Sequence, residues 1–541
     1  MWQADLGNGT FRNPILYADY SDPDAIRVGD DYYMVASSFC NSPALPILHS
    51  KDLVNWKVLS YALQKVPEFR YRNPIHGCGV WAPAIRYHEG KFFICFPMPD
   101  EGIYMTTATD PKGPWSESVN IRPGAGWIDP CPFWDEDGRA YLVSGVAKSR
   151  IGYKSIINMT EMAPDGMSLI GETVPIFNGN LNGNVTAEGP KMYKRNGYYY
   201  ILLPAGGVKT GWQLCLRSKE VFGPYEHRIV MRQEDTAVNG PHQGAWVDTQ
   251  CGEDWFLHFQ DVFAAGRIVH LQPMHWVDDW PIIGQPVAGK TYGKPVSVYK
   301  KPATGHENDA PFEPDTTDYF ENGKMNLAWQ WNANFDESFL VPAGADANAE
   351  ESAPAESGLR LAAVKASVNR PVCDYRNLLL QKWPAPEFTC TTKIQMHDLK
   401  NGDFAGIVNM GVNYAALGIL KKDDRYYIRK VTGVQEFDCD VSYAREQVED
   451  TEISLYDLAG TVTFTYQVKV ASVVEESLTP NGETLPRHNQ EQVTMSINIG
   501  NPVVLQARAG RWVGVKNGVF CEHLGDGEGG SCLVKEVVYE V

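Results

Sequence analysis

Five side chains that can perform or support chemistry occupy the same place in five similar stretches of the first 260 residues. They belong to Asp22, Trp81, Asp129, Glu188 and His242. Paired carboxyl groups can act as general acid and general base, and an aromatic ring can pack against the C–H face of a sugar. If the fold brings these positions together, the combination suits cleavage of a glycosidic bond.

The stretches that carry these residues have the pattern of β-hairpins. Each begins with a short apolar run, passes through a turn such as Glu89-Gly90 or Asn196-Gly197, and ends in an aromatic-rich run. The aromatic residues of the second runs lie at positions 32, 92, 141, 198 and 255, so the intervals are 60, 49, 57 and 57 residues. Hairpin repeats of this length predict a β-propeller, in which equivalent positions of successive blades face one axis.

The rest of the chain predicts a second β-domain. Five blades of about 60 residues account for about the first 300 residues. Residues 301–317 are polar and contain three prolines, as linkers often do. Later runs, such as 388–394 and 462–468, are typical of strands. We therefore predict an all-β chain: a five-bladed propeller over 1–300, a linker over 301–317, and a jelly-roll-like β-sandwich over 318–541.

Composition narrows the classes of partner. The formal net charge is −18 with no block of Lys or Arg, which argues against nucleic acid and anionic membranes and suits a neutral oligosaccharide. The 11 cysteines form no Cys-x-x-Cys pair, which argues against a zinc site or a disulfide framework and favours a reducing compartment. The sequence starts without the features of a signal peptide, so we expect a cytoplasmic protein, with a secreted parent trimmed of its signal left open. A homo-oligomer is also left open.

Several motifs in the same order resemble glycoside hydrolase family 43. The resemblance implies a five-bladed propeller and hydrolysis with inversion of the anomeric configuration, and the C-terminal part resembles the β-sandwich of the family's β-xylosidase-like branch. The matching stretches are Asn13-Pro-Ile-Leu, Asp22-Pro, Trp81-Ala-Pro, Asp129-Pro, Glu188-Gly-Pro, Gly266-Arg267 and Asn377-Leu-Leu-Leu-Gln-Lys.

The resemblance implies a role for each carboxylate. Asp22 is the general base that activates water, Glu188 is the general acid, and Asp129 orients Glu188 and raises its pKa. Crowded like charges cannot all ionise, which is consistent with one of the three staying protonated near neutral pH. The family usually has Pro-Asp-Pro-Ser around the base, whereas this chain has Ser21-Asp22-Pro23-Asp24, so Asp24 is the alternative base.

The resemblance also implies roles for three other residues. Trp81 stacks on the sugar, with a core tryptophan as the alternative. Arg267 donates hydrogen bonds to sugar hydroxyls, and it could also neutralise the carboxylates. His242 faces a hydrated calcium ion on the propeller axis, with a purely structural histidine as the alternative. Because calcium prefers many oxygen ligands, water would have to supply most of them.

Taken together, these features predict an exo-acting, inverting glycoside hydrolase. We expect it to release β-D-xylose from the non-reducing ends of xylo-oligosaccharides, as a xylan 1,4-β-xylosidase does, with α-L-arabinofuranosidase side activity. The alternatives are an α-L-arabinofuranosidase that acts on arabinoxylan-type side chains, an endo-arabinanase, and a carbohydrate-binding propeller without catalysis.

Overall fold

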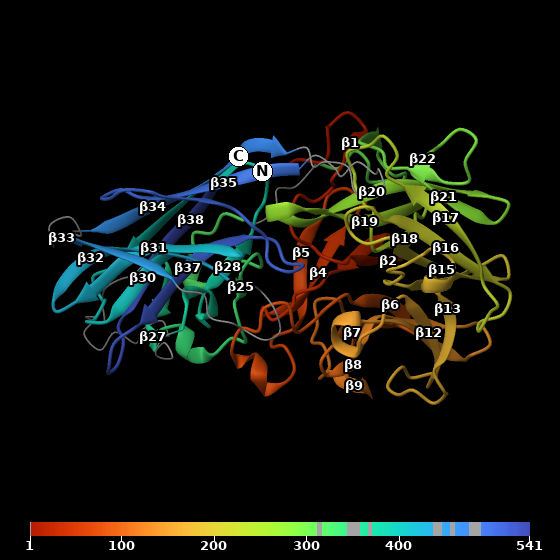
Figure 1. Ribbon diagram of the computed structural model, residues 1–541, viewed down its shortest axis with the longest axis horizontal. Coiled ribbons are helices and arrows are strands. Elements are labelled where there is room, and N and C mark those ends of the chain that lie inside the picture. The colour runs from red at the N-terminus through yellow and green to blue at the C-terminus, as the bar shows by residue number, and fades with distance from the viewer. Residues whose placement is uncertain are drawn as a thin grey trace.

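The computed structural model describes residues 2–310, 316–342, 357–365, 370–435, 446–454, 460–474 and 488–541. Figure 1 shows two β-rich parts side by side, with the N-terminal strands on the right and the C-terminal strands on the left. The helical elements of these ranges are short, and none could cross a membrane. They are α1 (Lys148–Ile151), η1 (Phe69–Arg72), η2 (Gly179–Leu181), η3 (Phe263–Ala265), η4 (Glu321–Gly323), η5 (Glu337–Phe339) and η6 (Val372–Asp374).

Over residues 24–294, antiparallel sheets follow one another along the chain. The first contains β2 (Asp24–Val28), β3 (Asp31–Val35), β4 (Ala44–Ser50) and β5 (Lys57–Leu63), and the second β6 (Ala84–His88), β7 (Lys91–Met98), β8 (Gly102–Ala108) and β9 (Val119–Pro123). The third contains β10 (Trp127–Trp134), β11 (Ala140–Val146), β12 (Ile156–Met162) and β13 (Val174–Asn178). The fourth contains β14 (Lys191–Arg195), β15 (Tyr198–Ala205), β16 (Trp212–Ser218) and β17 (Glu226–Arg232), extended by β23 (Gly293–Lys294) and β22 (Gln285–Pro286). The fifth contains β18 (Gly244–Asp248), β19 (Asp254–Val262), β20 (Gly266–Val277) and β21 (Trp280–Ile283).

The aromatic residues that mark the sequence repeat each lie in the second strand of a sheet, β3, β7, β11, β15 or β19. Apolar clusters join each sheet to the next, and one cluster joins the fifth sheet back to the first. These clusters contain Ile47 and Phe96, Met105 and Leu142, Val143 and Leu203, Tyr200 and Phe256, and Leu257 and Met34. The sheets therefore close into a ring, which turns equivalent strand ends toward one axis.

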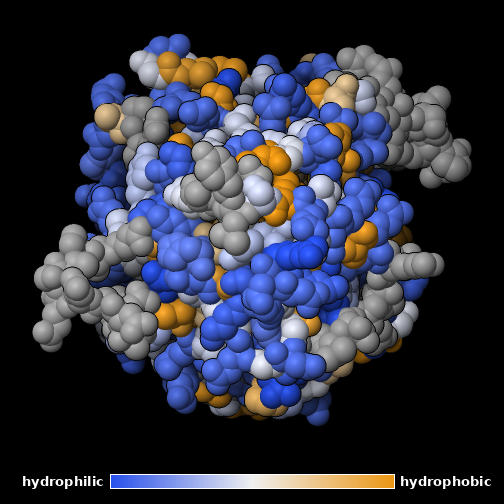
Figure 2. Space-filling model, turned by 90° about the vertical axis from the view of Figure 1, so that its left-hand side faces the viewer, coloured by the Kyte–Doolittle hydropathy of each residue, from blue (hydrophilic) through white to orange (hydrophobic). Residues whose placement is uncertain are grey.

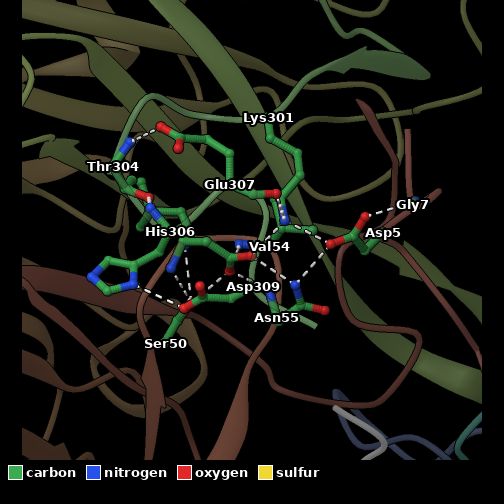
Figure 3. A network of polar contacts seen from close by, with 12 residues as sticks. Asp5, Gly7, Ser50, Val54, Asn55, Lys301, Thr304, His306, Glu307 and Asp309 are labelled. Carbon is green, nitrogen blue, oxygen red and sulfur yellow. Dashed lines mark hydrogen bonds and ion pairs between the residues drawn. The ribbon is translucent and has the colours of Figure 1, made fainter. Parts of the chain in front are cut away.

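A second closure ties the N-terminus to the end of the propeller. Strand β1 (Thr10–Arg12) pairs with β24 (Val298–Lys300). The next residue, Lys301, is buried, and its ammonium group contacts Asp5 at 2.6 Å (Figure 3). The same group lies 3.0 Å from Asp52. The first residues of the predicted linker therefore pack against the propeller, while its residues 311–315 lie outside the described part of the chain.

The C-terminal part is a sandwich of two sheets. One contains β25 (Gln330–Trp331), β28 (Leu379–Lys382), β37 (Lys516–His523), β30 (Asp403–Met410), β31 (Asn413–Lys422), β32 (Arg425–Val434) and β33 (Gln447–Ile453), with β27 (Val364–Lys365) beside β37. The other contains β26 (Leu359–Ala362), β38 (Ser531–Glu540), β29 (Phe388–Gln395), β34 (Thr461–Val474), β35 (His488–Ile497) and β36 (Val503–Gln506).

Apolar side chains of both sheets, including Ile407, Phe464 and Val519, form one buried core with Trp383, which directly follows β28. The outer end of the sandwich is mostly hydrophilic, with hydrophobic residues scattered over it (Figure 2). Burial of one face of each sheet is what holds a sandwich together. The predicted all-β architecture, a propeller followed by a β-sandwich, is confirmed.

Backbone hydrogen bonds fix the sandwich against the propeller. Ser42 and Trp331 exchange two such bonds, of 2.6 and 3.1 Å. On a second segment, the N–H group of Val515 donates to the carbonyl of Ala264 at 2.7 Å. Ala264 lies in η3, directly before the strand that carries Arg267. The sandwich is therefore anchored next to one of the residues predicted to bind substrate.

Candidate active site

Asp22, just before β2, and Asp129, within β10, adopt the same unusual backbone conformation. Their φ angles are 56° and 53°, in the left-handed region that aspartate tolerates better than most residues. Each precedes a proline, and Asp129 lies in β10 where the register shifts between Ile128 and Cys131. Such irregularities redirect side chains next to functional sites. Both residues are buried.

Three donors surround the carboxylate of Asp22. The hydroxyl groups of Ser21 and Ser37 each donate to Oδ2 at 2.7 Å. The guanidinium group of Arg267 donates to Oδ1 at 2.8 Å. These donors stabilise a negative charge on Asp22, and Oδ1 keeps a second lone pair with which a water molecule could be held.

Asp24, the alternative base, has a different environment. Its Oδ2 accepts hydrogen bonds from the N–H group of Ile85 at 2.8 Å and from the guanidinium group of Arg86 at 2.7 Å. Both donors belong to β6 of the second sheet, and Asp24 is fully buried. Asp24 therefore ties two sheets together, which favours Asp22 as the residue that meets substrate.

Asp129 lies among other charged groups. Burial, then the nearby Glu188 and then Asp22, raise the pKa of Asp129 to about 7. A hydrogen bond from the N–H group of Gly189 and the positive charge of the buried Lys191 act in the opposite direction. The donor nitrogen of Gly189 lies 2.7 Å from Oδ2 of Asp129. A carboxyl group with this pKa holds a proton near neutral pH.

Glu188 is more open than the two aspartates. Its side chain is 27% exposed, and its Oε1 lies 3.3 Å from Nε2 of the buried His242. The following residue, Gly189, has φ of +61°, and a Cβ atom there would lie 2.8 Å from the side chain of Gln243. Glycine is therefore needed at this turn. The turn directs Glu188 toward solvent while its own backbone contacts Asp129.

His242 was predicted to face a hydrated calcium ion. Among the residues that the structure describes, neither of its ring nitrogens has a hydrogen-bond partner. The described side chains do not gather a set of oxygen ligands around it, although calcium needs six to eight. An ion here would take most of its ligands from water. The calcium ion stays a prediction, and no chemical step is assigned to it.

Arg267 is held on several sides. Its backbone N–H group donates to Oδ1 of Asp19 at 2.9 Å. Its guanidinium group lies 4.5 Å from the ring centre of Phe259, and its side-chain Nε lies 3.7 Å from Oδ2 of Asp261. The side chain is 8% exposed. These contacts orient the guanidinium group toward Asp22, where it can also reach a sugar hydroxyl.

Trp81 lies at the boundary between the two domains. Its ring contacts Trp512 of the sandwich edge to face, at a centroid distance of 4.7 Å, and the guanidinium group of Arg150 lies 4.9 Å from the ring centre. The indole N–H group donates to the carbonyl of Gly77 at 3.0 Å. Trp81 is partly exposed rather than a core residue. A partly exposed ring of this kind can pack against a sugar.

Asp19 connects the loop that carries Trp512 to Arg267. Its Oδ2 accepts a hydrogen bond from the N–H group of Gly514 at 2.9 Å, and its Oδ1 accepts from that of Arg267 at the same distance. A Cβ atom on Gly266 would lie 2.5 Å from Asp19, so the close contact requires glycine. The sandwich loop is therefore fixed relative to the carboxylates of the propeller.

The structure brings Asp22, Asp129, Glu188, His242 and Arg267 into one cluster, and it places Trp81 against the neighbouring sandwich loop. Four residues of this region were not predicted: Asp19, Ser37, Lys191 and Trp512. Lys191 follows Glu188 by three residues in the Glu-Gly-Pro-Lys motif, so its place in the motif was a usable signal. Trp512 comes from the other domain, where no repeat marks it.

This arrangement can perform acid–base chemistry. One carboxylate is stabilised in its charged form by three donors. A second carboxyl group, that of Asp129, has its pKa raised to about 7 by burial and by the nearby Glu188. A charged base and a protonated acid in one cluster are the two groups that hydrolysis of a glycosidic bond requires.

Comparison with known proteins agrees with this chemistry. Residues 11–281 match the family described as Glycosyl hydrolases family 43, and residues 317–540 match the Beta xylosidase C-terminal Concanavalin A-like domain. A putative beta-xylosidase of Xylanibacter ruminicola is 41% identical over 419 residues, which cover 77% of this chain and 74% of that protein.

Two further proteins resemble nearly the whole chain. A non-reducing end alpha-L-arabinofuranosidase of Bacteroides ovatus is 28% identical over 511 residues, which cover 87% of this chain and 88% of that protein. A solved family 43 structure from Bacillus licheniformis has the same fold, with a TM-score of 0.75 at 24% identity over 98% of this chain and 99% of that one. The family 43 model matches the propeller of this chain, and the carboxylates converge in that propeller. The chain therefore belongs to glycosyl hydrolase family 43 and is a glycoside hydrolase.

Proposed function

We propose that this enzyme removes β-D-xylose from the non-reducing ends of xylo-oligosaccharides with inversion at the anomeric carbon. The observation that carries the proposal is the convergence of Asp22, Asp129 and Glu188, which lie in or just before the first strands β2, β10 and β14 of three sheets, with Arg267 bound to Asp22 at 2.8 Å. Three crowded carboxyl groups destabilise one another, so a protein that only binds sugar has no need of them.

In the proposed reaction, Asp22 accepts a proton from a water molecule whose oxygen attacks the anomeric carbon. The bond from that carbon to the leaving oxygen breaks, and Glu188 gives its proton to this oxygen. Asp129 keeps a proton available to Glu188 near neutral pH, because the two groups are close and Asp129 is buried. Exchange with solvent then restores both protonation states.

The proposed substrate class is supported by the relatives. The relative from Xylanibacter ruminicola, which is 41% identical to this chain, is named as a putative beta-xylosidase. An α-L-arabinofuranosidase is the second candidate, because another relative carries that name and because the two sugars present similar hydroxyl geometry to a pocket. Action on chain ends is supported by the sandwich loop, where Trp512 contacts Trp81 at 4.7 Å and can narrow access to the pocket.

Initial rates on an aryl β-D-xyloside and an aryl α-L-arabinofuranoside test the substrate. We expect a higher kcat/KM on the xyloside. Turnover of the arabinofuranoside alone would show that the xylosidase assignment is wrong, and no turnover of either by folded protein would favour a carbohydrate-binding propeller. The products released from linear arabinan distinguish an endo-arabinanase from an exo-acting enzyme, since an endo-arabinanase releases oligomers rather than monomers.

A further inference from the structure

A buried cluster of possible metal ligands, none of which is one of the carboxylates described above, lies where the propeller meets the sandwich. It consists of His76, in the segment after η1, and of Cys373 and Asp374 in η6. Their ligand atoms all lie within 4.8 Å of one another, and all three residues are buried. His76 Nε2 lies 3.4 Å from Oδ1 of Asp374, although the two residues belong to different domains.

Asp374 has the environment of an unsatisfied charge. Its side chain is 3% exposed, and neither carboxylate oxygen accepts a hydrogen bond from the residues that the structure describes. Burial of a carboxylate without such partners is costly, and native proteins nearly always compensate it with hydrogen bonds, an opposite charge or a metal ion. Glu446 adds a further acidic group nearby, since its Oε1 accepts a hydrogen bond from the N–H group of Val372 at 2.6 Å.

The surroundings hold the three residues in place. The side-chain amide of Asn332 donates to the carbonyls of Cys373 and Tyr375 at 2.8 and 2.9 Å, which fixes the turn of η6. The thiol of Cys373 donates to Oε1 of Gln435, while Nε2 of Gln435 has no partner among the described residues. Rotation of this amide would present an N–H donor to a thiolate. The same site can therefore stabilise Cys373 in its metal-binding form.

We propose that His76, Cys373 and Asp374 bind one zinc ion between the domains. A thiolate, an imidazole and a carboxylate are the ligands that zinc prefers, whereas calcium and magnesium prefer oxygen alone. One thiolate and one carboxylate balance the charge of a divalent ion, and a water molecule completes a tetrahedral shell. The ligands lie 297 residues apart in sequence, so no local Cys or His spacing reveals the site.

The proposed ion would join the two domains near the substrate pocket. His76 is adjacent to Gly77, whose carbonyl accepts the hydrogen bond from the indole of Trp81. On the sandwich side, η6 leads into the strand β28, which pairs with β37. Binding therefore stabilises the domain interface, and we expect it to appear in unfolding measurements of the whole chain as well as in metal analysis.

Zinc binding by the full-length protein tests this proposal. The protein is stripped with a chelator, dialysed and titrated with Zn²⁺ in competition with a chromophoric chelator. We expect one ion per chain and a thermal midpoint that rises with zinc concentration. Cys373→Ser should lower the affinity at least about 100-fold, because loss of a ligand exceeds the effect of losing an outer-shell partner. Cys390→Ser, a buried cysteine of the sandwich core, is the matched control and should bind normally.

Cobalt(II) provides a second, spectroscopic readout, applied to variants whose circular dichroism shows that they are folded. The wild-type protein and Cys390→Ser should show a thiolate-to-cobalt charge-transfer band, which Cys373→Ser and Asp374→Asn lack or weaken. Absence of stoichiometric zinc and of the cobalt band in wild-type protein would overturn the proposal and leave a plain ion pair between His76 and Asp374. Unchanged zinc affinity in folded Cys373→Ser would overturn it as well, because the ion would then bind elsewhere.

Discussion

The backbone N–H group of Gly189 donates a hydrogen bond to Oδ2 of Asp129 at 2.7 Å, so the peptide that follows Glu188 is held against the buried aspartate. This contact fixes the spacing between the proposed acid and its neighbouring carboxyl group. The hydrogen bond itself lowers the pKa of Asp129, but burial and then the nearby Glu188 outweigh it and raise that pKa to about 7. The pH dependence of the enzyme should therefore depend on Asp129.

Asp129→Asn should move the alkaline limb of the kcat/KM profile to lower pH. In the native enzyme, burial and then Glu188 raise the pKa of Asp129 to about 7, and activity should fall as the pH rises through this value and Asp129 loses its proton. Without the charge of Asp129, Glu188 gives up its proton more readily, so the fall begins earlier. Rates measured from about pH 4 to 9 check the direction, and an unmoved limb would show that Asp129 does not share a proton with the acid.

Glu188→Ala should affect substrates according to their leaving groups. A general acid contributes about 10²- to 10⁴-fold to the rate when the leaving oxygen needs a proton. We expect a loss of this size on xylobiose and a much smaller loss on an aryl xyloside whose phenol leaves without help. Equal losses on both substrates would contradict the role of Glu188 as proton donor.

Asp22→Gly should remove the base without straining the chain, because glycine adopts the φ of 56° found at this position. We expect kcat to fall by at least about 10³-fold. Azide can then occupy the place of the activated water, so it should restore turnover and yield a xylosyl azide of inverted configuration. Asp24→Gly serves as the comparison. If azide restored turnover in Asp24→Gly but not in Asp22→Gly, Asp24 would be the base.

Lys301→Met should destabilise the propeller by about 3–5 kcal/mol, because it leaves Asp5 and Asp52 buried without their cation. Burial alone would raise the pKa of Asp5, but hydrogen bonds, that of Lys301 first, lower it overall. The ion pair of Asp5 with Lys301 therefore makes its full contribution to the free energy of unfolding above about pH 4. This contribution is lost as the pH falls through the lowered pKa of Asp5. Urea midpoints at pH 7 and at about pH 3.5 should show the difference narrowing in acid.

Lys300→Met is the control for this substitution. The side chain of Lys300 is 62% exposed and pairs with Glu253, whereas that of Lys301 is 1% exposed. An exposed ion pair contributes at most about 1 kcal/mol. Similar midpoints for the two variants would show that the buried network of Figure 3 does not stabilise the closure of the propeller.

The repeat in the sequence carried most of the prediction of the site. Asp22, Asp129 and Glu188 could be grouped because each occupies the same position of a hairpin repeat, and ring closure turns such positions toward one axis. The contact of Arg267 with Asp22 could be inferred only from the family resemblance, because Arg267 lies on β20 and outside the repeated position.

Contacts between the domains could not be predicted from the sequence. Trp512 and Gly514 reach the pocket from a loop of the sandwich, and their partners Trp81 and Asp19 lie more than 400 residues earlier. No local pattern records which face of one domain meets the other, since docking depends on the shapes of two complete surfaces. The meeting of His76 with Cys373 is hidden from the sequence for the same reason.

The central claim, that three carboxylates of the propeller hydrolyse a xyloside with inversion, is tested most directly by proton NMR of xylobiose during its first turnovers. We expect the xylose released from the non-reducing end to appear first as the α-anomer and then to mutarotate. Initial release of the β-anomer, or no release by folded enzyme, would contradict the account.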